Sequence, residues 1–315
     1  MAKISFFYLW GMENNPISVK MVLDEFKQKL AANYGQAEVM QFAYLLFEAW
    51  MGWTKAEVHM ESRKVLKGEE VSRFWDALRQ LQENKPIQYI IGATHFLDTK
   101  IKVQEGVLIP RPETEELAAM ILRDSRHRQY EELSLLDIGT GSGCIPVAIK
   151  KQMPGMDVTA IDISPLALQI AKENSTLNQC RVKFILADIL DRQGWKNFPG
   201  YTIIVSNPPY IPESERLSMH PNVVEYEPHE ALFVTDEDPL RFYTAIAEFA
   251  YLHLVRPGSL YLEINGRFGK QIREFLLSTG FDKAEVLKDI HGKDRFIRAE
   301  AKTTMLDTSY WNVEH

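Results

Sequence analysis

"LLDIGTGSGCIPVAIK", residues 135–150, places three glycines between an apolar run typical of a buried strand and a run of helical character. Glycine lacks a Cβ, so the chain can turn tightly there and a ligand can approach the backbone. The spacing is Gly-x-Gly-x-Gly followed by Cys144, which displaces the third small residue of the dinucleotide fingerprint and disfavours a nicotinamide cofactor. The stretch therefore predicts a different cofactor, bound where a strand of an α/β sheet passes into a helix.

The chain around this turn alternates between β-rich and helical stretches, after a first helix that is expected to begin near Glu113. This alternation predicts a doubly wound, mostly parallel α/β sheet. Two final runs, 283–289 and 294–301, are expected to close the sheet as an antiparallel edge. The five earlier strand-like runs are "LSLLDIG", "DVTAIDI", "VKFILAD", "YTIIVSN" and "GSLYLEI".

The part of the chain before the sheet is predicted to be a small helical bundle. Apolar residues recur at helical spacing in 19–30 and 38–50. Thr54 and Glu57 have the spacing of a capping box, which predicts a third helix over 54–66, and a fourth is expected from Ser72 until Pro86 stops it. A Trp50–Trp53 patch could lie on the surface of this bundle or within its core.

These patterns predict the organisation of the whole chain. A β-hairpin with its turn at Asp98-Thr99 is expected to connect the bundle to the α/β domain. An alternative start of translation at Met12 would leave the first eleven residues outside the natural protein. The expected segments are an N-terminal extension (1–16), the helical bundle (17–92), the hairpin linker (93–110), the α/β domain (111–302) and a polar tail (303–315).

Composition excludes several classes of protein. The 315 residues carry a net charge of −7, and residues 1–100 are neutral, with 12 basic and 12 acidic side chains. Such a chain is a poor candidate for a sequence-tolerant nucleic-acid binder, whose affinity comes mainly from phosphate contacts. Neither the two cysteines nor the eight histidines have metal-ligand spacing, and no apolar run is long enough to span a bilayer. We therefore expect a soluble cytoplasmic protein with reduced thiols and no metal.

Three aspartates are predicted to contact the cofactor. Asp162 closes the strand after the glycine turn, where a carboxylate can accept hydrogen bonds from both ribose hydroxyls of a nucleoside. S-adenosylmethionine fits, since it has a ribose but no phosphate for a glycine turn to cradle. Asp137 is placed for the ammonium or an ordered water of its methionine part, and Asp188 lies near the adenine, with Ile189 packing on its ring. As alternatives, Asp162 caps the next helix and Asp188 is an ordinary residue at a strand end.

A second predicted site is "SNPPYIPES", residues 206–214, which follows a strand. Proline fixes its own φ and holds the preceding residue extended, so this loop is stiff. The Asn207 side-chain oxygen and the Pro208 carbonyl could accept the two N–H hydrogens of a planar amide and hold its nitrogen in line with a sulfonium methyl. Tyr210 would stack on the flat face of that substrate. The alternative is a proline-rich surface turn.

With these motifs, the sequence resembles the HemK-type release-factor glutamine methyltransferases. The resemblance covers about 17–301 and includes "PIQYIIG", "LIPRPETEEL", "DIGTGSG", "SNPPYI", "EYEPHEAL" and "LEINGRFG". It implies a Rossmann-like class I methyltransferase domain behind a bundle that grips the partner. It also implies transfer of a methyl group from S-adenosylmethionine to the Gln side-chain amide in the Gly-Gly-Gln motif of peptide-chain release factors. We expect a monomer that binds neither nucleic acid nor membrane.

The resemblance also assigns residues. It implies substrate contacts from the prolines and the aromatic of the second site and pocket-lining roles for Arg111, Glu113 and Thr114, which could equally be an ordinary helix N-terminus. Glu227 and Glu263 lie in matching segments, but chemistry alone assigns them no role. The implied cofactor contacts are Gly139, Thr140, Gly141, Ser142, Gly143 and Asp162, and the implied substrate loop is Asn207, Pro208, Pro209 and Tyr210. Asn207 is expected to contact the cofactor as well as the substrate.

Three other functions are compatible with parts of the sequence. An amino-methyltransferase acting on adenine in DNA or RNA could use the same Asn-Pro-Pro-Tyr chemistry, but it would have to flip out the base and hold a polyanion. An oxidoreductase would use the glycine turn and leave that loop unexplained. A cofactor-binding scaffold without catalysis would have no need of Asn207 and Tyr210.

Overall fold

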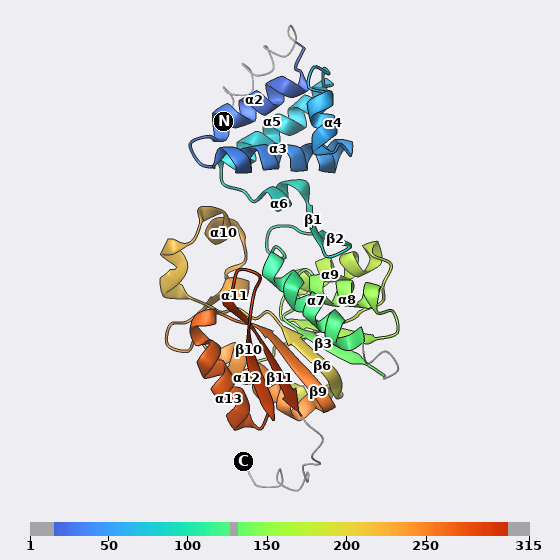
Figure 1. Ribbon diagram of the computed structural model, residues 1–315, viewed down its shortest axis with the longest axis vertical. Helices are drawn as coiled ribbons and strands as arrows, with labels where there is room; N and C mark the ends of the chain where they lie inside the picture. The colour runs from blue at the N-terminus through green and yellow to red at the C-terminus, as the bar shows by residue number, and fades with distance from the viewer. Residues whose placement is uncertain (1–15, 127–131, 302–315) are drawn as a thin grey trace. The chain divides into compact units, whose positions relative to one another are not determined.

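The computed structural model describes residues 16–126 and 132–301, which form two compact units (Figure 1). Of the described residues, 16–92 and Pro221–Tyr226 form the smaller unit, and the others form the larger unit. The predicted N-terminal extension, the alternative start at Met12 and the polar tail lie outside the described residues, except for Pro16.

The smaller unit is built from amphipathic helices around one apolar core. Ser18 caps the first helix by accepting the N–H of Met21, and the predicted capping box of Thr54 and Glu57 is confirmed. Phe26, Phe47 and Phe74 are among the fully buried side chains of the core. The helices are α2 (Val19–Leu30), α3 (Gln36–Met51), α4 (Lys55–Met60), α5 (Gly68–Gln82), α6 (Ile87–Ile91) and α10 (Pro221–Tyr226).

Two helix boundaries in this unit differ from the predictions. Helix α4 ends at Met60 rather than at residue 66, because the chain then turns and Val65 forms an antiparallel bridge with Ser18. Helix α5 begins four residues earlier than predicted, because the Glu70 carboxylate accepts the N–H of Lys67 (2.7 Å) and so starts the helix before Ser72.

Trp50 and Trp53, which the sequence left open between surface and core, lie at the surface of the helical unit and also contact its core. Trp50 and Trp53 are half-buried and pack on phenylalanines of the core. The guanidinium of Arg73 lies 4.3 Å from the Trp50 ring centroid, and the ammonium of Lys64 lies 4.5 Å from that of Trp53. The two rings therefore contribute to the core on one side and carry cations on the other.

The larger unit confirms the doubly wound sheet. Its order is β10-β11-β9-β6-β3-β4-β5, parallel from β9 to β5, with β10 and β11 forming the predicted antiparallel edge. The strands are β3 (Ser134–Ile138), β4 (Asp157–Asp162), β5 (Lys183–Leu186), β6 (Tyr201–Ser206), β9 (Leu254–Glu263), β10 (Lys283–Lys288) and β11 (Asp294–Ala301).

Helices cover both faces of this sheet (Figure 1). Helices α7 (Pro112–Arg126), α8 (Cys144–Gln152) and α9 (Pro165–Leu177) form one layer. Helices α12 (Arg241–His253) and α13 (Gly269–Thr279) form the other. Leu260 and Leu262 of β9 face the α12 layer, so the alternate residues Tyr261 and Glu263 face α7.

The predicted hairpin is formed by β1 (Ala93–Phe96) and β2 (Thr99–Lys102) and belongs to the larger unit. Its turn lies one residue earlier than predicted, at Leu97-Asp98. Thr99 is already paired with Phe96, and its hydroxyl donates to the Phe96 carbonyl (2.6 Å). Because of that pairing and hydrogen bond, Thr99 is the first residue of β2 and not part of the turn.

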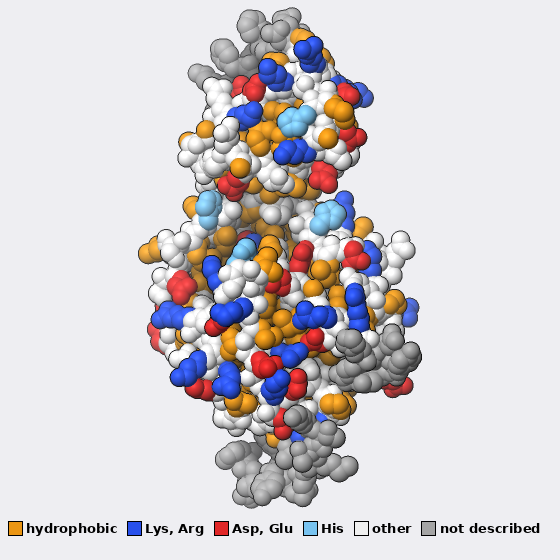
Figure 2. Space-filling model, viewed as in Figure 1, with side chains coloured by type: hydrophobic (Ala, Val, Ile, Leu, Met, Phe, Trp, Pro, Cys, Tyr) orange, Lys and Arg blue, Asp and Glu red, His pale blue; other side chains and the backbone are white. Residues whose placement is uncertain are grey.

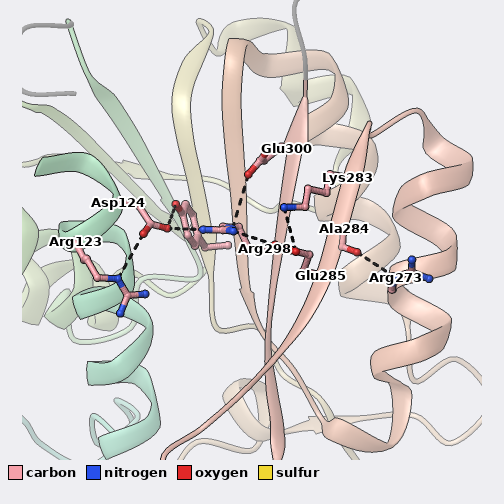
Figure 3. A network of polar contacts seen from close by, with 9 residues as sticks. Arg123, Asp124, Arg273, Lys283, Ala284, Glu285, Arg298 and Glu300 are labelled. Atoms are coloured by element: carbon pink, nitrogen blue, oxygen red, sulfur yellow. Dashed lines mark hydrogen bonds and ion pairs between the residues drawn. The ribbon is translucent and has the colours of Figure 1, made fainter. Parts of the chain in front are cut away.

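A network of polar contacts holds the C-terminal end of α7 against the sheet (Figure 3). Asp124 near the end of α7 accepts the hydroxyl of Tyr261 (2.9 Å) and a guanidinium N–H of Arg298 on β11 (3.1 Å). Arg298 also donates to Glu285 on β10 (2.9 Å). The helix is therefore bonded directly to β9 and β11 at one end, and through Arg298 to β10, while its other end reaches the carboxyl edge of the sheet.

The glycine turn depends on two different properties of glycine. Gly139, Gly141 and Gly143 have φ values of 72°, 54° and 77°, which side chains rarely adopt. A Cβ on Gly139 would meet open space, whereas a Cβ on Gly143 would lie 2.8 Å from the Cβ of Ala171 on α9. The first glycine leaves the backbone open to a ligand, and the third allows two helices to pack closely.

We expect Gly143→Ala to destabilise the protein by about 2–5 kcal/mol, because it adds overpacking to a left-handed backbone cost of about 1–2 kcal/mol. Gly139→Ala is the matched control, since it incurs only the backbone cost. Urea denaturation of both variants measures the difference. Equal losses of stability would show that the close approach to Ala171 is unimportant.

Candidate active site

A cavity of about 620 Å³ lies in the larger unit at the carboxyl edge of the sheet. The strand order reverses direction at β3, with β4 on one side and β6 on the other, and ligands of open α/β sheets bind at such a point. The register brings the ends of these strands together, since Ile138 pairs with both Ile161 and Ser206. Of the predicted site residues, Gly139, Gly141, Asp162, Asp188, Ile189, Asn207, Pro208 and Pro209 line the cavity.

Asp162 links the glycine turn to the next helix. One carboxylate oxygen accepts the N–H of Gly141 (2.8 Å), and the other accepts the N–H of Ser164 (2.9 Å). Ser164, not Asp162, caps α9, because its hydroxyl accepts the N–H of Ala167. Burial raises the pKa of Asp162, and the two backbone donors oppose that rise. The carboxylate is therefore held at the cavity wall, and each of its oxygens can accept a further hydrogen bond.

Asp137 is buried beneath the turn and is not part of the cavity lining. Within the part of the chain that the structure describes, neither of its carboxylate oxygens has a hydrogen-bond partner, and the same is true of the Thr140 hydroxyl. Burial raises the pKa of Asp137 from 3.8 to about 7. An unpartnered buried carboxyl next to a glycine turn fits a cationic ligand group, which would supply the missing partner.

The adenine end of the predicted site is apolar. Ile189 is buried in the cavity wall, and Asp188 accepts the N–H of Leu190 (2.8 Å). Ile163, which follows Asp162, is 63% exposed and also lines the cavity. An exposed isoleucine and a buried one in the same cavity lining suit a flat aromatic ring, although the sequence pattern did not single out Ile163.

The Asn-Pro-Pro-Tyr loop is fastened from behind by buried polar groups. The Asn207 side-chain nitrogen donates to the Thr114 hydroxyl oxygen (3.1 Å), and that hydroxyl donates to the Glu263 carboxylate (2.8 Å). The Tyr210 hydroxyl donates to the other oxygen of Glu263 (3.1 Å). Asn207 and both prolines face the cavity, while Tyr210 lies outside its lining.

Arg111 and Glu113 are not among the residues that line the cavity. The Arg111 guanidinium lies 2.5 Å from the Glu227 carboxylate, which is 1% exposed. The same carboxylate accepts the N–H of Ile109 (3.1 Å). Glu227 thus ties the chain, where it re-enters the larger unit after α10, to the segment before α7.

Sequence reasoning missed the part of the cavity wall that comes from distant segments. No local motif marks these residues, because they reach the cavity only through the fold. They are Gly106, Val107 and Leu108 after the hairpin, Pro228, Glu230 and Ala231 after α10, and Arg241, Phe242 and Ile246 on α12.

Residues 16–126 and 132–301 contain neither a metal-binding cluster nor a membrane-spanning helix. No three His, Cys, Asp or Glu side chains there come together in a way that could hold a metal ion. No helix in these ranges is long and apolar enough to cross a membrane.

We expect the Asp137→Asn variant to gain stability relative to the wild type as the pH rises from about 4 to about 7. Because burial raises the pKa of Asp137, folding takes up a proton there, and the stabilisation is fully present below the unfolded pKa and lost as the pH passes through about 7. Urea denaturation of both proteins at pH 5 and pH 8 measures the difference in their free energies of unfolding. A stability difference that is the same at both pH values would mean that Asp137 is solvated.

A glycine turn, a strand-end carboxylate and an amide-bearing proline loop at the switch point of a doubly wound sheet form a site that fits S-adenosylmethionine, and the matching family model makes the chain a methyltransferase that uses it. The chain matches the methyltransferase small domain over residues 117–226 and the PrmC N-terminal domain over residues 22–92.

Curated relatives narrow the class. The chain is 40% identical over 281 residues to the release factor glutamine methyltransferase of Flavobacterium psychrophilum, a match that covers 89% of this chain and 98% of the relative. It is 40% identical over 274 residues to the enzyme of the same name from Bacteroides thetaiotaomicron, covering 87% and 96%. The chain belongs to the release factor glutamine methyltransferase family.

Proposed function

We propose that the protein transfers a methyl group from S-adenosylmethionine to the side-chain amide nitrogen of the Gln in the Gly-Gly-Gln motif of peptide-chain release factors. The observation that carries this proposal is the Asn207 amide on the cavity wall, with its nitrogen bound to Thr114 and its oxygen left for a substrate N–H. The names of the curated relatives support the same substrate.

The loop residues account for the acceptor chemistry. The nitrogen of a carboxamide is a weak nucleophile because its lone pair is delocalised, so catalysis must come from positioning and from stabilising a pyramidal nitrogen. In our proposal the Asn207 oxygen and the Pro208 carbonyl accept its two N–H hydrogens, and the Tyr210 ring stacks on its flat face. No base is needed before transfer, since the methylated cationic nitrogen releases its proton readily.

The cofactor supplies an electrophilic methyl group on its sulfonium sulfur. We propose that Asp162 binds the ribose hydroxyls and that the Asp137 carboxylate pairs with the ammonium of the methionine part. Asp188 and Ile189 would contact the adenine. The backbone of the glycine turn, Gly139, Thr140, Gly141, Ser142 and Gly143, would hold the remaining polar atoms.

We propose that the helical unit grips the release factor and that the protein acts as a monomer in the cytoplasm, without binding nucleic acid or membrane. The neutral balance of residues 1–100 supports a protein partner for this unit. On the face seen in Figure 2, basic and acidic side chains of the described residues are interspersed over both units. Such a surface is unlike the basic stripe that follows a nucleic-acid backbone.

The proposal is tested by competition among methyl acceptors. Purified protein and labelled S-adenosylmethionine are given a non-methylated release factor, the same factor with Gln of Gly-Gly-Gln replaced by Ala, and adenine-rich DNA. Label is expected only in the intact factor. Label in the DNA would replace our substrate with adenine, the alternative that shares the Asn-Pro-Pro-Tyr loop. Label in the Gln-to-Ala factor would place the acceptor at another atom.

A further inference from the structure

The orientation of the Asn207 amide decides whether the loop can accept a substrate N–H. A carboxamide has an acceptor oxygen and a donor nitrogen of similar size, so a flip exchanges the two at the cavity wall. With its nitrogen toward the cavity, Asn207 would present a donor to the substrate's own donors. Something in the protein must therefore select one orientation.

Thr114 can make this selection. A hydroxyl group has one hydrogen to donate, and the Thr114 hydroxyl gives it to Glu263 at 2.8 Å. Its oxygen can then only accept, so it binds the nitrogen of Asn207, at 3.1 Å, and not its oxygen. The three side chains come from the N-terminal end of α7, the end of β9 and the loop after β6, and two of the three residues, Thr114 and Glu263, are buried.

Glu263 is itself fixed by the surrounding fold. Its other carboxylate oxygen accepts the Tyr210 hydroxyl (3.1 Å), and its backbone carbonyl accepts the hydroxyl of the fully buried Tyr243 (3.3 Å). The side-chain nitrogen of Asn265 donates to the Tyr210 carbonyl (3.4 Å). Hydrogen bonds thus connect both ends of the Asn-Pro-Pro-Tyr motif to the end of β9, Asn207 through Thr114 and Tyr210 directly.

We propose that Thr114 and Glu263 are positioning residues for methyl transfer, forming a hydrogen-bond relay that turns the Asn207 amide oxygen toward the substrate. This inference rests on the proposed reaction and goes beyond it, because neither residue touches the reacting atoms. The relay makes the orientation of Asn207 a property of the fold, set before any substrate arrives.

The relay needs the ionised form of Glu263. A proton on the oxygen that faces Thr114 would have to be donated to the Thr114 oxygen, which would release the hydroxyl hydrogen toward Asn207. Burial raises the pKa of Glu263 from 4.5 to about 7, and the hydroxyl donors oppose this rise. The charged and titratable groups around it are Arg295 on β11, Glu113 on α7, Cys144 on α8, Tyr243 on α12 and Tyr210.

The central test is Thr114→Val, which keeps the shape of the side chain and removes the hydroxyl. We expect kcat for a release-factor substrate to fall about 10- to 100-fold, because the amide is no longer oriented. The Kd for S-adenosylmethionine should stay within about twofold, since Thr114 is outside the cavity lining. Thr114→Ser restores the hydroxyl and should keep kcat within about threefold. An unchanged kcat in Thr114→Val overturns the relay.

Two comparisons separate positioning from a loss of packing. Thr99→Val removes a buried hydroxyl that also donates to an oxygen, and it should leave kcat unchanged. In an Asn207→Ala background, Thr114→Val should cause no further loss, because the relay acts through Asn207. A further full loss there would show that Thr114 acts by another route. We also expect wild-type kcat at saturating cofactor to fall below about pH 7 as Glu263 becomes protonated, and this fall should vanish in Thr114→Val.

A readout without turnover keeps this inference distinct from the proposed function. In protein with labelled Asn amides and Thr methyl groups, the wild type should give a nuclear Overhauser effect between the Asn207 amide protons and the Thr114 methyl group. Its absence would overturn the relay even in an active enzyme. Its presence in a protein that methylates no release factor would support the relay and reject the proposed substrate.

Discussion

Asn207→Ala is expected to lower turnover about 10²–10³-fold, the usual loss for one oriented group that stabilises a transition state. The Kd for S-adenosylmethionine should rise by less than about threefold. Although Asn207 lies in the cavity wall, its oxygen is proposed to bind the acceptor amide, whose nitrogen becomes pyramidal and more positive only as the methyl arrives. An interaction that strengthens only in the transition state appears in kcat and not in ground-state binding.

Single-turnover rates with preloaded cofactor, together with calorimetric titration of the cofactor, measure the two quantities separately. The matched control is Asn197→Ala, which removes an exposed amide at the end of a short helical turn in the same unit. It should change neither quantity. If the variant at Asn207 instead lost cofactor affinity while the bound cofactor still reacted at the wild-type rate, the loop would belong to the cofactor site.

The α/β framework was predictable because its signals are local. The central parallel strands are short apolar runs that are buried along nearly their whole length, as in the six consecutive buried residues of β6, whereas β5 at the sheet edge is more exposed. The glycine turn follows directly from a sequence pattern, and its three positive φ values are what glycine permits. The carboxyl edge then follows from parallel pairing, which brings Asp162 and Asn207 to one side without further information.

The polar network behind the loop was not predictable, since it is entirely non-local. Thr114 and Glu263 are 149 positions apart, and Arg111 and Glu227 are 116 apart. The sequence marked Glu263 as part of a motif but assigned it no role. Only the packing of α7 against β9 brings the Thr114 hydroxyl to its carboxylate.

The assignment of α10 to the helical unit was missed for the same reason. Its six residues follow the Asn-Pro-Pro-Tyr loop in the chain, and nothing in their pattern connects them to a bundle that ends more than a hundred residues earlier. A hydrogen bond connects α10 to the rest of the helical unit, since the Tyr226 hydroxyl donates to the Glu83 carbonyl (2.7 Å). The chain therefore crosses between the units twice more after the hairpin.

Asp162→Ala is expected to raise the Kd for S-adenosylmethionine about 10²–10³-fold. Hydrogen bonds to a charged group contribute about 1.5–3 kcal/mol each, and a tenfold change in Kd corresponds to about 1.4 kcal/mol. The two oxygens of Asp162 already accept the N–H groups of Gly141 and Ser164. Because a carboxylate offers about four lone-pair sites, each oxygen retains one for a ribose hydroxyl.

The same substitution also frees the Gly141 N–H, so part of the loss comes from the glycine turn itself. Asp162→Asn separates the two contributions, because its amide keeps one acceptor and places a donor against one of the two backbone N–H groups. We expect it to lose most of the affinity too. Asp157→Asn, at the exposed beginning of the same strand, is the control and should bind normally. With saturating cofactor, kcat of Asp162→Asn should stay within about threefold of the wild type, since Asp162 does not contact the acceptor. A loss of kcat with unchanged Kd would move Asp162 from cofactor binding to the transfer step.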